Sequence, residues 1–488
     1  MEKISGSLQA NMDYMNQMLG VEHNFDVVHR TMKIGDKEAC MYLIDGFCKD
    51  DLIQKILQYF MDMKPEDVPQ DAETLVQQYI PHVEVEVEER FDKLMVSLLS
   101  GMFVLFVEGY EKAVLVDSRT YPARSVEEPE KDKVLRGSKD GFVETVVFNT
   151  ALIRRRIRSE KLRMEMLSAG ECSHTDIVLC YMDDRVDRDF LEELRRKING
   201  IQVESLTMNQ ESLAECIYQR KWFNPFPKFK YTERPDTAAA QVLEGNIIVL
   251  VDNSPSAMII PTTIFDVVDE ADDYYFPPIT GTYLRLTRFF IALLTYIMTP
   301  TFLLLINNPQ FIPDGFEFIM LKEDPNIPIL WQFLILELAI DGLKLAAVNT
   351  PNMLSTPLSV MAALVLGEFS VNSGWFSSEV MLYMAFVAIA NYTQANYELG
   401  YALKFMRILN LILTSLFGLW GYIAAILIAV LAVLCNRTVS HRSYAYPLVP
   451  LNAGELAQRL IRKRLPGAKQ GAKTSVAQAE QTAQRGGK

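Results

Sequence analysis

Residues 289–306 read FFIALLTYIMTPTFLLLI, a run in which no side chain is charged. Its 18 residues are close to the minimum that crosses the roughly 30 Å hydrocarbon core of a bilayer. Residues 408–436 form a second uncharged run of 29 residues, which is long enough to cross once with tilt. Together the two runs predict an α-helical, multipass membrane domain, which we place at residues 281–436.

The stretch between these runs carries charge at helical spacing. Residues 328–348 hold Glu337, Asp341 and Lys344, which fall on one face of a helix. Charges at bilayer depth are costly unless they face water or protein, and they often mark a functional site. A second interpretation is that Asp341 pairs with Lys344 near an interface, while Glu337 supports a helix contact.

A shorter apolar segment, residues 353–367 (MLSTPLSVMAALVLG), has small side chains at helical spacing and is followed by Glu368. Small side chains let helices approach closely, and they can also line a pore. Because the segment is too short to cross a bilayer, we expect a re-entrant or interfacial helix here. The small side chains are Thr356, Ser359, Ala363 and Gly367.

Basic side chains beside the apolar runs predict the orientation. Arg285 and Arg288 precede the first run, and ten basic and two acidic residues follow Asn436. By the positive-inside rule, the N-terminal domains and the C-terminal tail then both lie in the cytoplasm. The number of crossings is therefore even. We expect four, at residues 289–306, 328–347, 378–395 and 409–434.

Charge is distributed unevenly along the chain. Through Arg288 there are 50 acidic and 34 basic residues, a net charge of −16, whereas the remainder carries +3, which gives −13 overall. This segregation excludes a disordered chain and a single globular domain, and the negative charge excludes a general nucleic-acid-binding surface. The first 20 residues lack the apolar run of a secretory signal peptide, so we expect the N-terminal part to remain in the cytoplasm.

Before the apolar runs, short strands alternate with amphipathic helices, and the same order returns about 140 residues later. Strands at 25–32 and 39–44 and helices at 50–61 and 90–99 are matched by a strand at 176–182 and a helix at 188–198. The repeat predicts duplicated α/β subdomains. The expected organisation is an N-terminal extension (1–23), a first α/β subdomain (24–120), a linker (121–141), a second α/β subdomain (142–280) and, after the membrane domain, a basic cytoplasmic tail (437–488) that is disordered at its end.

The sequence shows no pattern typical of catalysis. It lacks a phosphate-binding loop, G-x-S-x-G and HExxH, and its histidines are scattered. We predict no enzyme, no metal site and no cofactor. The six cysteines form no CxxC pair, which favours a reducing compartment without disulfides. Residues 136–141 (RGSKDG) either cradle a phosphate or form a solvated turn, and the basic residues within 154–163 are expected on a solvated or subunit-facing helix.

Three segments carry a family resemblance: FDVVHRTMKIGDKEACMYLIDGF from Phe25, NPFPKFKYTERPDTAAAQVLEGNIIVLVDNSPSAMIIPTT from Asn224, and LAAVNTPNMLSTPLSVMAALVLGEFSVNSGWFSSEVMLYMAFVAIANYT from Leu345. They resemble the GerA family of spore germination proteins, A-subunit type, and the resemblance covers residues 24–465. Details such as LIDGFCKDD resemble a sporulation branch of that family more than its nutrient-receptor A subunits. Where the receptors commonly have Arg-Glu-Ala after a membrane glutamate, this chain has GLKLA at residues 342–346.

The resemblance implies a multipass protein of the inner membrane of the endospore that acts in germination. The related A subunits are thought to oligomerise into ion channels that open when partner subunits sense a nutrient. We therefore expect an oligomeric ion-channel subunit that contributes to ion release; the alternative is a non-conducting scaffold that docks other germination proteins. The expected partners are membrane lipid, further copies of the chain and other spore germination membrane proteins, without nucleic acid.

Physical reasoning also places the ion pathway in the membrane segments between the two uncharged runs, because polar side chains there can replace the hydration of an ion. A transporter is disfavoured, since the membrane segments show no inverted repeat. The pore or intramembrane candidates are Glu337, Asp341, Ser359 and Glu368, together with Lys344, Thr356, Ala363 and Gly367.

Overall fold

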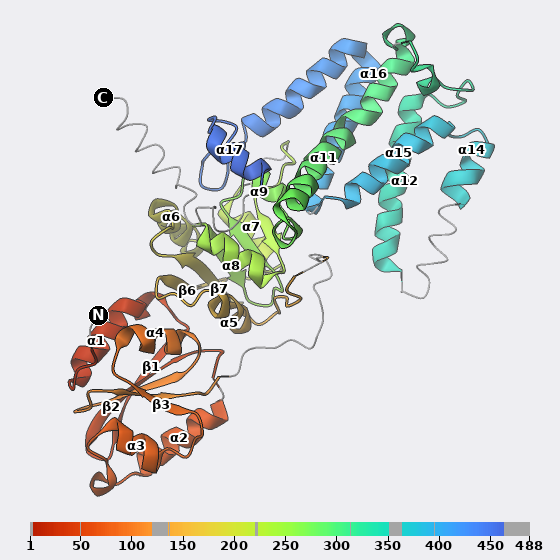
Figure 1. The fold of residues 1–488 in the computed structure, drawn as a ribbon. Helices are drawn as coiled ribbons and strands as arrows, with labels where there is room; N and C mark the ends of the chain where they lie inside the picture. The colour runs from red at the N-terminus through yellow and green to blue at the C-terminus, as the bar shows by residue number, and fades with distance from the viewer. Residues whose placement is uncertain are drawn as a thin grey trace, which may run out of the picture. The chain divides into compact units, whose positions relative to one another are not determined.

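The computed structural model describes residues 3–48, 50–119, 135, 137–219, 223–312, 314–350, 364–394 and 396–462. They form two compact units. Unit 1 comprises Met1–Gln219 and Phe229–Pro261, and unit 2 comprises Arg220–Lys228 and Thr262–Lys463. Unit 1 is the α/β part of the chain, whereas unit 2 is helical (Figure 1). Residues 262–280, expected in the second subdomain, lie with the helices.

Unit 1 contains one arrangement of elements twice. The sheet of the first subdomain has the order β1-β2-β4-β5-β3, and that of the second has the equivalent order β6-β7-β9-β10-β8. All paired strands are antiparallel, which confirms the duplicated α/β prediction. The first copy consists of α1 (Leu8–Leu19), β1 (Val27–Ile34), β2 (Lys37–Ile44), α2 (Asp50–Asp62), α3 (Ala72–Tyr79), β3 (Val85–Glu88), α4 (Phe91–Leu99), β4 (Phe103–Val107) and β5 (Ala113–Val116). The second consists of α5 (Val146–Arg156), β6 (Leu162–Ala169), β7 (Thr175–Met182), α6 (Arg188–Asn199), α7 (Gln210–Ile217), β8 (Lys230–Thr232), α8 (Pro235–Leu243), β9 (Ile247–Val251) and β10 (Ala257–Ile260).

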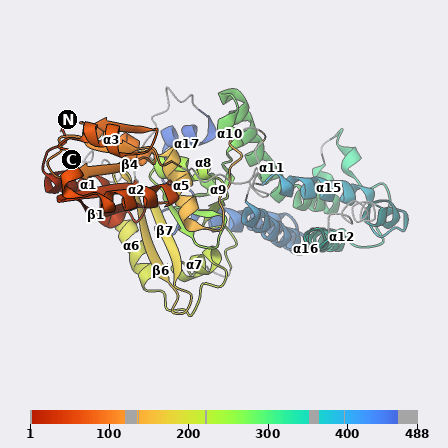
Figure 2. The ribbon, with the colours of Figure 1, turned by 90° about the horizontal axis from the view of Figure 1, so that it is seen from below.

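Helices cover both faces of the first sheet. Helices α1 and α4 pack on one face, and α2 and α3 pack on the other (Figures 1 and 2). Alternation along β2 supplies both cores, since Tyr42 and Ile44 join the first and Met41 and Leu43 join the second. Because both faces are buried, the central strand β4 (FVLFV) is apolar throughout.

Helix α1 belongs to this repeated unit. Its Met15 and Leu19 are fully buried in the core that it shares with β2 and β4. In the second copy, α5 occupies the equivalent place in the order of elements. Residues 1–23, expected as an extension, therefore supply one of the helices of the first subdomain.

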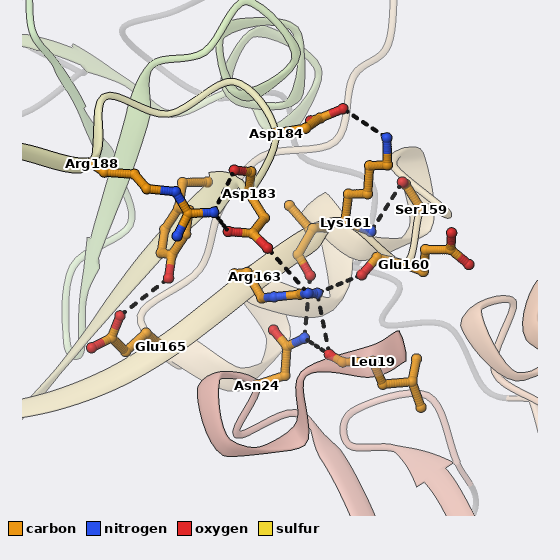
Figure 3. Close-up of polar contacts among 12 residues, drawn as sticks. Leu19, Asn24, Ser159, Glu160, Lys161, Arg163, Glu165, Asp183, Asp184 and Arg188 are labelled. Carbon is orange, nitrogen blue, oxygen red and sulfur yellow. Dashed lines mark hydrogen bonds and ion pairs between the residues drawn. The ribbon is translucent and has the colours of Figure 1, made fainter. Parts of the chain in front are cut away.

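Buried polar contacts join the two subdomains of unit 1 (Figure 3). The side chain of Asn24 accepts a hydrogen bond from the backbone N–H of Met164 at 2.6 Å, and it donates to the carbonyl of Leu19. Arg163, on β6, donates to the same carbonyl at 3.2 Å. The chain between α1 and β1 is thereby fixed to the edge strand of the second sheet.

An ion pair lies beside this junction. The Arg154 guanidinium donates to both carboxylate oxygens of Asp26, at 2.8 and 2.9 Å, and both side chains are fully buried. Burial raises the pKa of Asp26, and the charge of Arg154 opposes that shift. The basic run is therefore not one solvated helix face, because α5 ends at Arg156, Arg154 is buried, and Arg163 lies on a strand.

In the described part of unit 2, two helices are long and apolar enough to be candidate membrane spans, α11 and α16, and α15 is a shorter apolar helix. Helix α12, which carries Glu337, Asp341 and Lys344, packs its first half against them through Phe333 and Leu336. The elements of unit 2 are α9 (Ile264–Val268), α10 (Asp272–Tyr275), α11 (Pro278–Asn307), α12 (Ile329–Asn349), a π-helical turn (Leu364–Phe369), α14 (Ser370–Asn372), α15 (Ser378–Tyr392), α16 (Tyr397–Leu434) and α17 (Ala453–Leu460).

Helix α16 reverses direction at Gly418, whose φ of 58° and ψ of −135° are not helical. Arg407 donates to the carbonyl of Thr295, while the hydroxyl of the adjacent Tyr296 donates to the carbonyl of Ala425. In a straight helix, residues 407 and 425 would be about 27 Å apart. The two halves of α16 therefore form a hairpin (Figure 1), so the continuous helix implied by the single crossing expected at 409–434 is interrupted at Gly418.

Candidate functional site

The charged face predicted on α12 meets two basic side chains of α16. The Arg407 Nε donates to Glu337 Oε1 at 2.7 Å, and the Arg407 Nη2 lies 2.6 Å from the same oxygen. The Lys404 Nζ donates to the Glu337 carbonyl at 3.1 Å, lies 3.5 Å from Glu337 Oε2, and forms an ion pair with Asp341. Both carboxylates on α12 are thus neutralised from α16.

These charges are largely removed from solvent. Relative exposure is 3% for Glu337, 5% for Lys404 and 0% for Arg407, while Asp341 is half-buried. Lys344 does not take Asp341 as its close partner; its Nζ lies 5.4 Å and 5.8 Å from the ring centroids of Tyr392 and Tyr401. With three cations and two carboxylates, the group carries one excess positive charge.

Uncharged polar side chains continue this group along the hairpin. We call Thr295 and Thr299 of α11, with Lys404, Arg407, Asn410 and Thr414 of α16, the polar seam; all six are buried. The Thr414 hydroxyl donates to the Asn410 side-chain oxygen at 3.0 Å. Among the residues that the structure describes, Asn410 Nδ2 and Thr299 Oγ1 have no hydrogen-bond partner, and buried polar atoms in this condition are usually satisfied by water.

Sequence reasoning missed the polar seam. Lys404 and Arg407 stand just before the charge-free run at 408–436 and outside the crossing predicted at 409–434. Thr295 stands in an apolar run, and its hydroxyl donates to the Ile291 carbonyl of the same helix at 2.8 Å. Because a threonine in any helix can make this hydrogen bond, its presence in the sequence does not indicate a polar site. The useful signal was the spacing of Lys404, Arg407, Asn410 and Thr414, which places polar groups on one helix face.

A second charge cluster surrounds the first turns of α11. The Arg285 Nε lies 3.1 Å from Asp269 and 3.2 Å from Asp273, and Arg288 also pairs with Asp273. Arg459, near the end of α17, pairs with Asp266 at 2.8 Å. Arg285 and Arg288, which we expected as flanking charges, are therefore buried and neutralised.

The remaining candidate pore residues fall into two groups, those outside the described residues and those in the π-helical turn. Thr356, Ser359 and Ala363 lie outside the described residues. Gly367 and Glu368 belong to the π-helical turn, in which Gly367 is half-buried and Glu368 is exposed. Neither joins the contacts of Glu337 and Asp341 described above. The structure thus unites the charged candidates of α12 with α16 and leaves Glu368 apart from them.

Metal-binding side chains are not grouped in the part of the chain that the structure describes: no three His, Cys, Asp or Glu side chains there could share an ion. The six cysteines are free thiols, of which Cys40 and Cys180 are buried. Burial raises the pKa of Cys40 to about 11, which leaves its thiol protonated near neutral pH.

A duplicated α/β unit and a helical unit with two candidate spans indicate the class of protein: a membrane protein with a large α/β part. A family model described as Bacillus/Clostridium GerA spore germination protein matches residues 13–473. The chain belongs to this family.

Its relatives are sporulation and spore germination proteins. The chain is 39% identical to Stage V sporulation protein AF of Bacillus subtilis, with 94% of this chain and 93% of that protein covered. It is 26% identical to spore germination protein KA of the same organism, with 94% and 85% covered. A crystal structure of the N-terminal domain of the A subunit of the Bacillus megaterium germinant receptor GerK3 is 26% identical, with a TM-score of 0.41, and covers 53% of this chain and 96% of that one.

Proposed function

We propose that this chain is an oligomeric ion-channel subunit of the inner spore membrane and contributes to ion release during germination. Its membership of the GerA family and its similarity to Stage V sporulation protein AF support a role in germination. The observation that carries the channel proposal is the polar seam, which brings hydroxyl, amide and charged side chains together inside otherwise apolar helices and, in this proposal, fixes the helices that flank the route. Polar groups at that depth are retained where ions or water must pass, or where helices must be held in one register.

The ion route is placed between copies of the chain. Within one protomer, Glu337 and Asp341 are matched by Arg407 and Lys404, and the excess positive charge there opposes the entry of a cation. In this proposal Glu337, Asp341 and Lys344 hold α12 in place. The route runs beside the segment with Thr356, Ser359, Ala363 and Gly367, and Glu368 lies at one end of it.

Six crossings fit the described contacts better than four. Asn326 Nδ2 donates to the Gly374 carbonyl at 3.0 Å, and the Ser377 N–H donates to Gln332 Oε1 at 2.8 Å. Gly374 therefore lies at the end of α12 where that helix begins. We count α11, α12, α15 and both halves of α16 as crossings, with the unit 1 side and the basic tail in the cytoplasm; the even number that the basic flanks predict then requires a sixth crossing between α12 and α15.

Flux measurements on liposomes test the proposal. The variant Ser359→Cys is reconstituted, and potassium flux is measured before and after a charged thiol reagent is added. The matched control is Leu427→Cys, since Leu427 is 56% exposed on the apolar α16. We expect the reagent to block flux only in Ser359→Cys. Oligomeric protein without flux, or flux through Ser359→Cys that is insensitive to the reagent, would contradict the proposed route.

A non-conducting scaffold is the second candidate, and the internal pairing of Glu337 and Asp341 favours it. Charges that are satisfied inside one protomer can serve only to fix α12 against α16. A scaffold also uses unit 1 to recruit other germination proteins to the membrane. Purification in detergent separates the two: a stable ring of identical copies supports the channel, whereas a monomer that assembles only with other germination proteins supports the scaffold.

A further inference from the structure

We propose that the end of unit 2 rests on an anionic lipid surface. The segment concerned is residues 444–462, which we call the foot; it comprises the loop after α16 and helix α17. The proposal rests on the membrane placement given above and adds to it a specific lipid contact. Its occupant is the negatively charged headgroup layer on the side where α11 enters the bilayer.

The foot is fixed to the first turns of α11. The Arg462 N–H donates to the Thr282 hydroxyl at 3.1 Å, and the Arg285 Nη1 donates to the Arg459 carbonyl at 2.7 Å. At the other end of the foot, the fully buried Tyr444 accepts a hydrogen bond from the Ile264 N–H at 3.0 Å. The position of the foot therefore follows that of α11.

This attachment sets the depth of the foot. Thr282 precedes the apolar run that begins at Phe289 by two turns of α11, a rise of about 10 Å. The headgroup layer on each side of the hydrocarbon core is about 5–8 Å thick. The foot thus stands at the outer boundary of the headgroup layer, where side chains of ordinary length reach the lipid.

The foot exposes large apolar side chains. Relative exposure is 46% for Leu448, 42% for Val449, 70% for Leu451 and 53% for Ile461. Helix α17 has no fully buried residue, and its leucines Leu456 and Leu460 are half-buried. A short amphipathic helix whose apolar side chains stay partly exposed, beside other exposed apolar residues, is typical of a segment that lies in a membrane interface.

The charge of this region selects the lipid. Residues 437–464 contain six basic side chains, of which Arg459 is paired with Asp266, and one acidic side chain, Glu455. The Glu455 carboxylate is already engaged, since it accepts a hydrogen bond from the Tyr446 hydroxyl at 2.6 Å. Arg437 is exposed. The excess of positive charge attracts acidic headgroups, and the apolar side chains beside it favour a bilayer over an acidic protein.

Spin labels measure this contact in the full chain. Exposed Cys172, Cys216 and Cys435 are first replaced by serine, and a nitroxide is attached to Leu451→Cys or Ile461→Cys. Leu427→Cys on α16 is the control for membrane placement, and Met208→Cys, 72% exposed in unit 1, is the aqueous control. The samples are vesicles of phosphatidylcholine with phosphatidylglycerol and vesicles of phosphatidylcholine alone. Collision rates are measured with oxygen, which enters lipid, and with a soluble nickel chelate.

We expect both foot labels to prefer oxygen in the anionic vesicles and to shift toward the nickel chelate in phosphatidylcholine alone. If they match Met208→Cys while Leu427→Cys prefers oxygen, the foot proposal is overturned and the membrane placement survives. Foot labels shielded from both reagents would show a protein cover and overturn it as well. Equal contact in both lipids would overturn the electrostatic part. Failure at Leu427→Cys would overturn the membrane placement itself.

Discussion

At the scale of single residues, each unit contains a buried carboxylate that forms an ion pair with a buried arginine. These are the pairs Asp26–Arg154 and Glu337–Arg407. Each pair must offset a large desolvation cost, which it does only while both partners are present. A carboxylate in an apolar helix can be recognised from sequence, as Glu337 was. Its partner cannot, because 70 residues separate the two and only the packing of α16 against α12 brings Arg407 to it.

Removing one partner of the buried pair in unit 1 should be strongly destabilising. For Asp26→Ala we expect the free energy of unfolding to fall by about 3–5 kcal/mol, because Arg154 is left as an uncompensated buried charge. The control is Lys161→Ala, whose ion pair with Asp184 is half-exposed and contributes about 0–1 kcal/mol. Chemical denaturation of the purified chain in detergent measures both. Equal losses for the two variants would contradict the assignment.

The pair in unit 2 should show coupling. Glu337→Gln and Arg407→Gln each leave one charge unmatched, so each is expected to lower thermal stability in detergent by about 3–5 kcal/mol. The double variant removes both charges and should cost less than the sum of the single changes, with a coupling energy of about 1–3 kcal/mol. Additive losses would mean that the two side chains do not act as a pair.

At the scale of elements, periodicity predicted most of the first subdomain. The helix expected at 50–61 is α2, and the strands near 39–44 and 176–182 are β2 and β7. Strand alternation and amphipathic spacing express burial directly, so they can be read without the fold. The hairpin in α16 could not be read this way. Gly418 lies in an apolar run, where only its backbone dihedral angles distinguish a turn from a continuous helix.

Glycine is required at the turn of α16. In Gly418→Ala the added Cβ meets a positive φ that L-residues rarely adopt, and we expect a loss of about 1–3 kcal/mol in thermal stability. Gly400→Ala is the control, because a Cβ at this helical position meets no atom within 4 Å and alanine is the better helix former. A Gly418→Ala variant as stable as Gly400→Ala would argue against the hairpin.

At the scale of the whole molecule, the reversal of α16 distinguishes the proposed six-crossing topology from the four crossings predicted from the sequence. With one crossing at 409–434, Tyr397 and Cys435 would lie on opposite sides; with a hairpin, they lie on the same side. Parity and basic flanks gave an even number of crossings, but they could not distinguish four from six. That distinction depends on Gly418 and on the contacts of Gly374 with the beginning of α12.

Labelling with a membrane-impermeant maleimide distinguishes these topologies. Tyr397→Cys, 63% exposed, should be modified from the same side as the exposed native Cys435. Phe316→Cys, in the connection between α11 and α12, marks the opposite side and is 51% exposed. The accessible side is assigned with sealed spheroplasts and inverted vesicles. Modification of Tyr397→Cys together with Phe316→Cys would restore the arrangement with a single crossing by α16.

The separation of Glu337 and Asp341 from their counter-charges has a consequence for biosynthesis. Ribosomes complete α12 before α16, and Lys404 follows Asp341 by 63 residues. A lone carboxylate costs about 2.5–3.5 kcal/mol at the centre of a helix during translocon insertion. In the proposed topology, nascent α12 therefore stays in a hydrated or protein-lined site until α16 is synthesised. The two helices then insert together, and a chain truncated between them fails to insert α12.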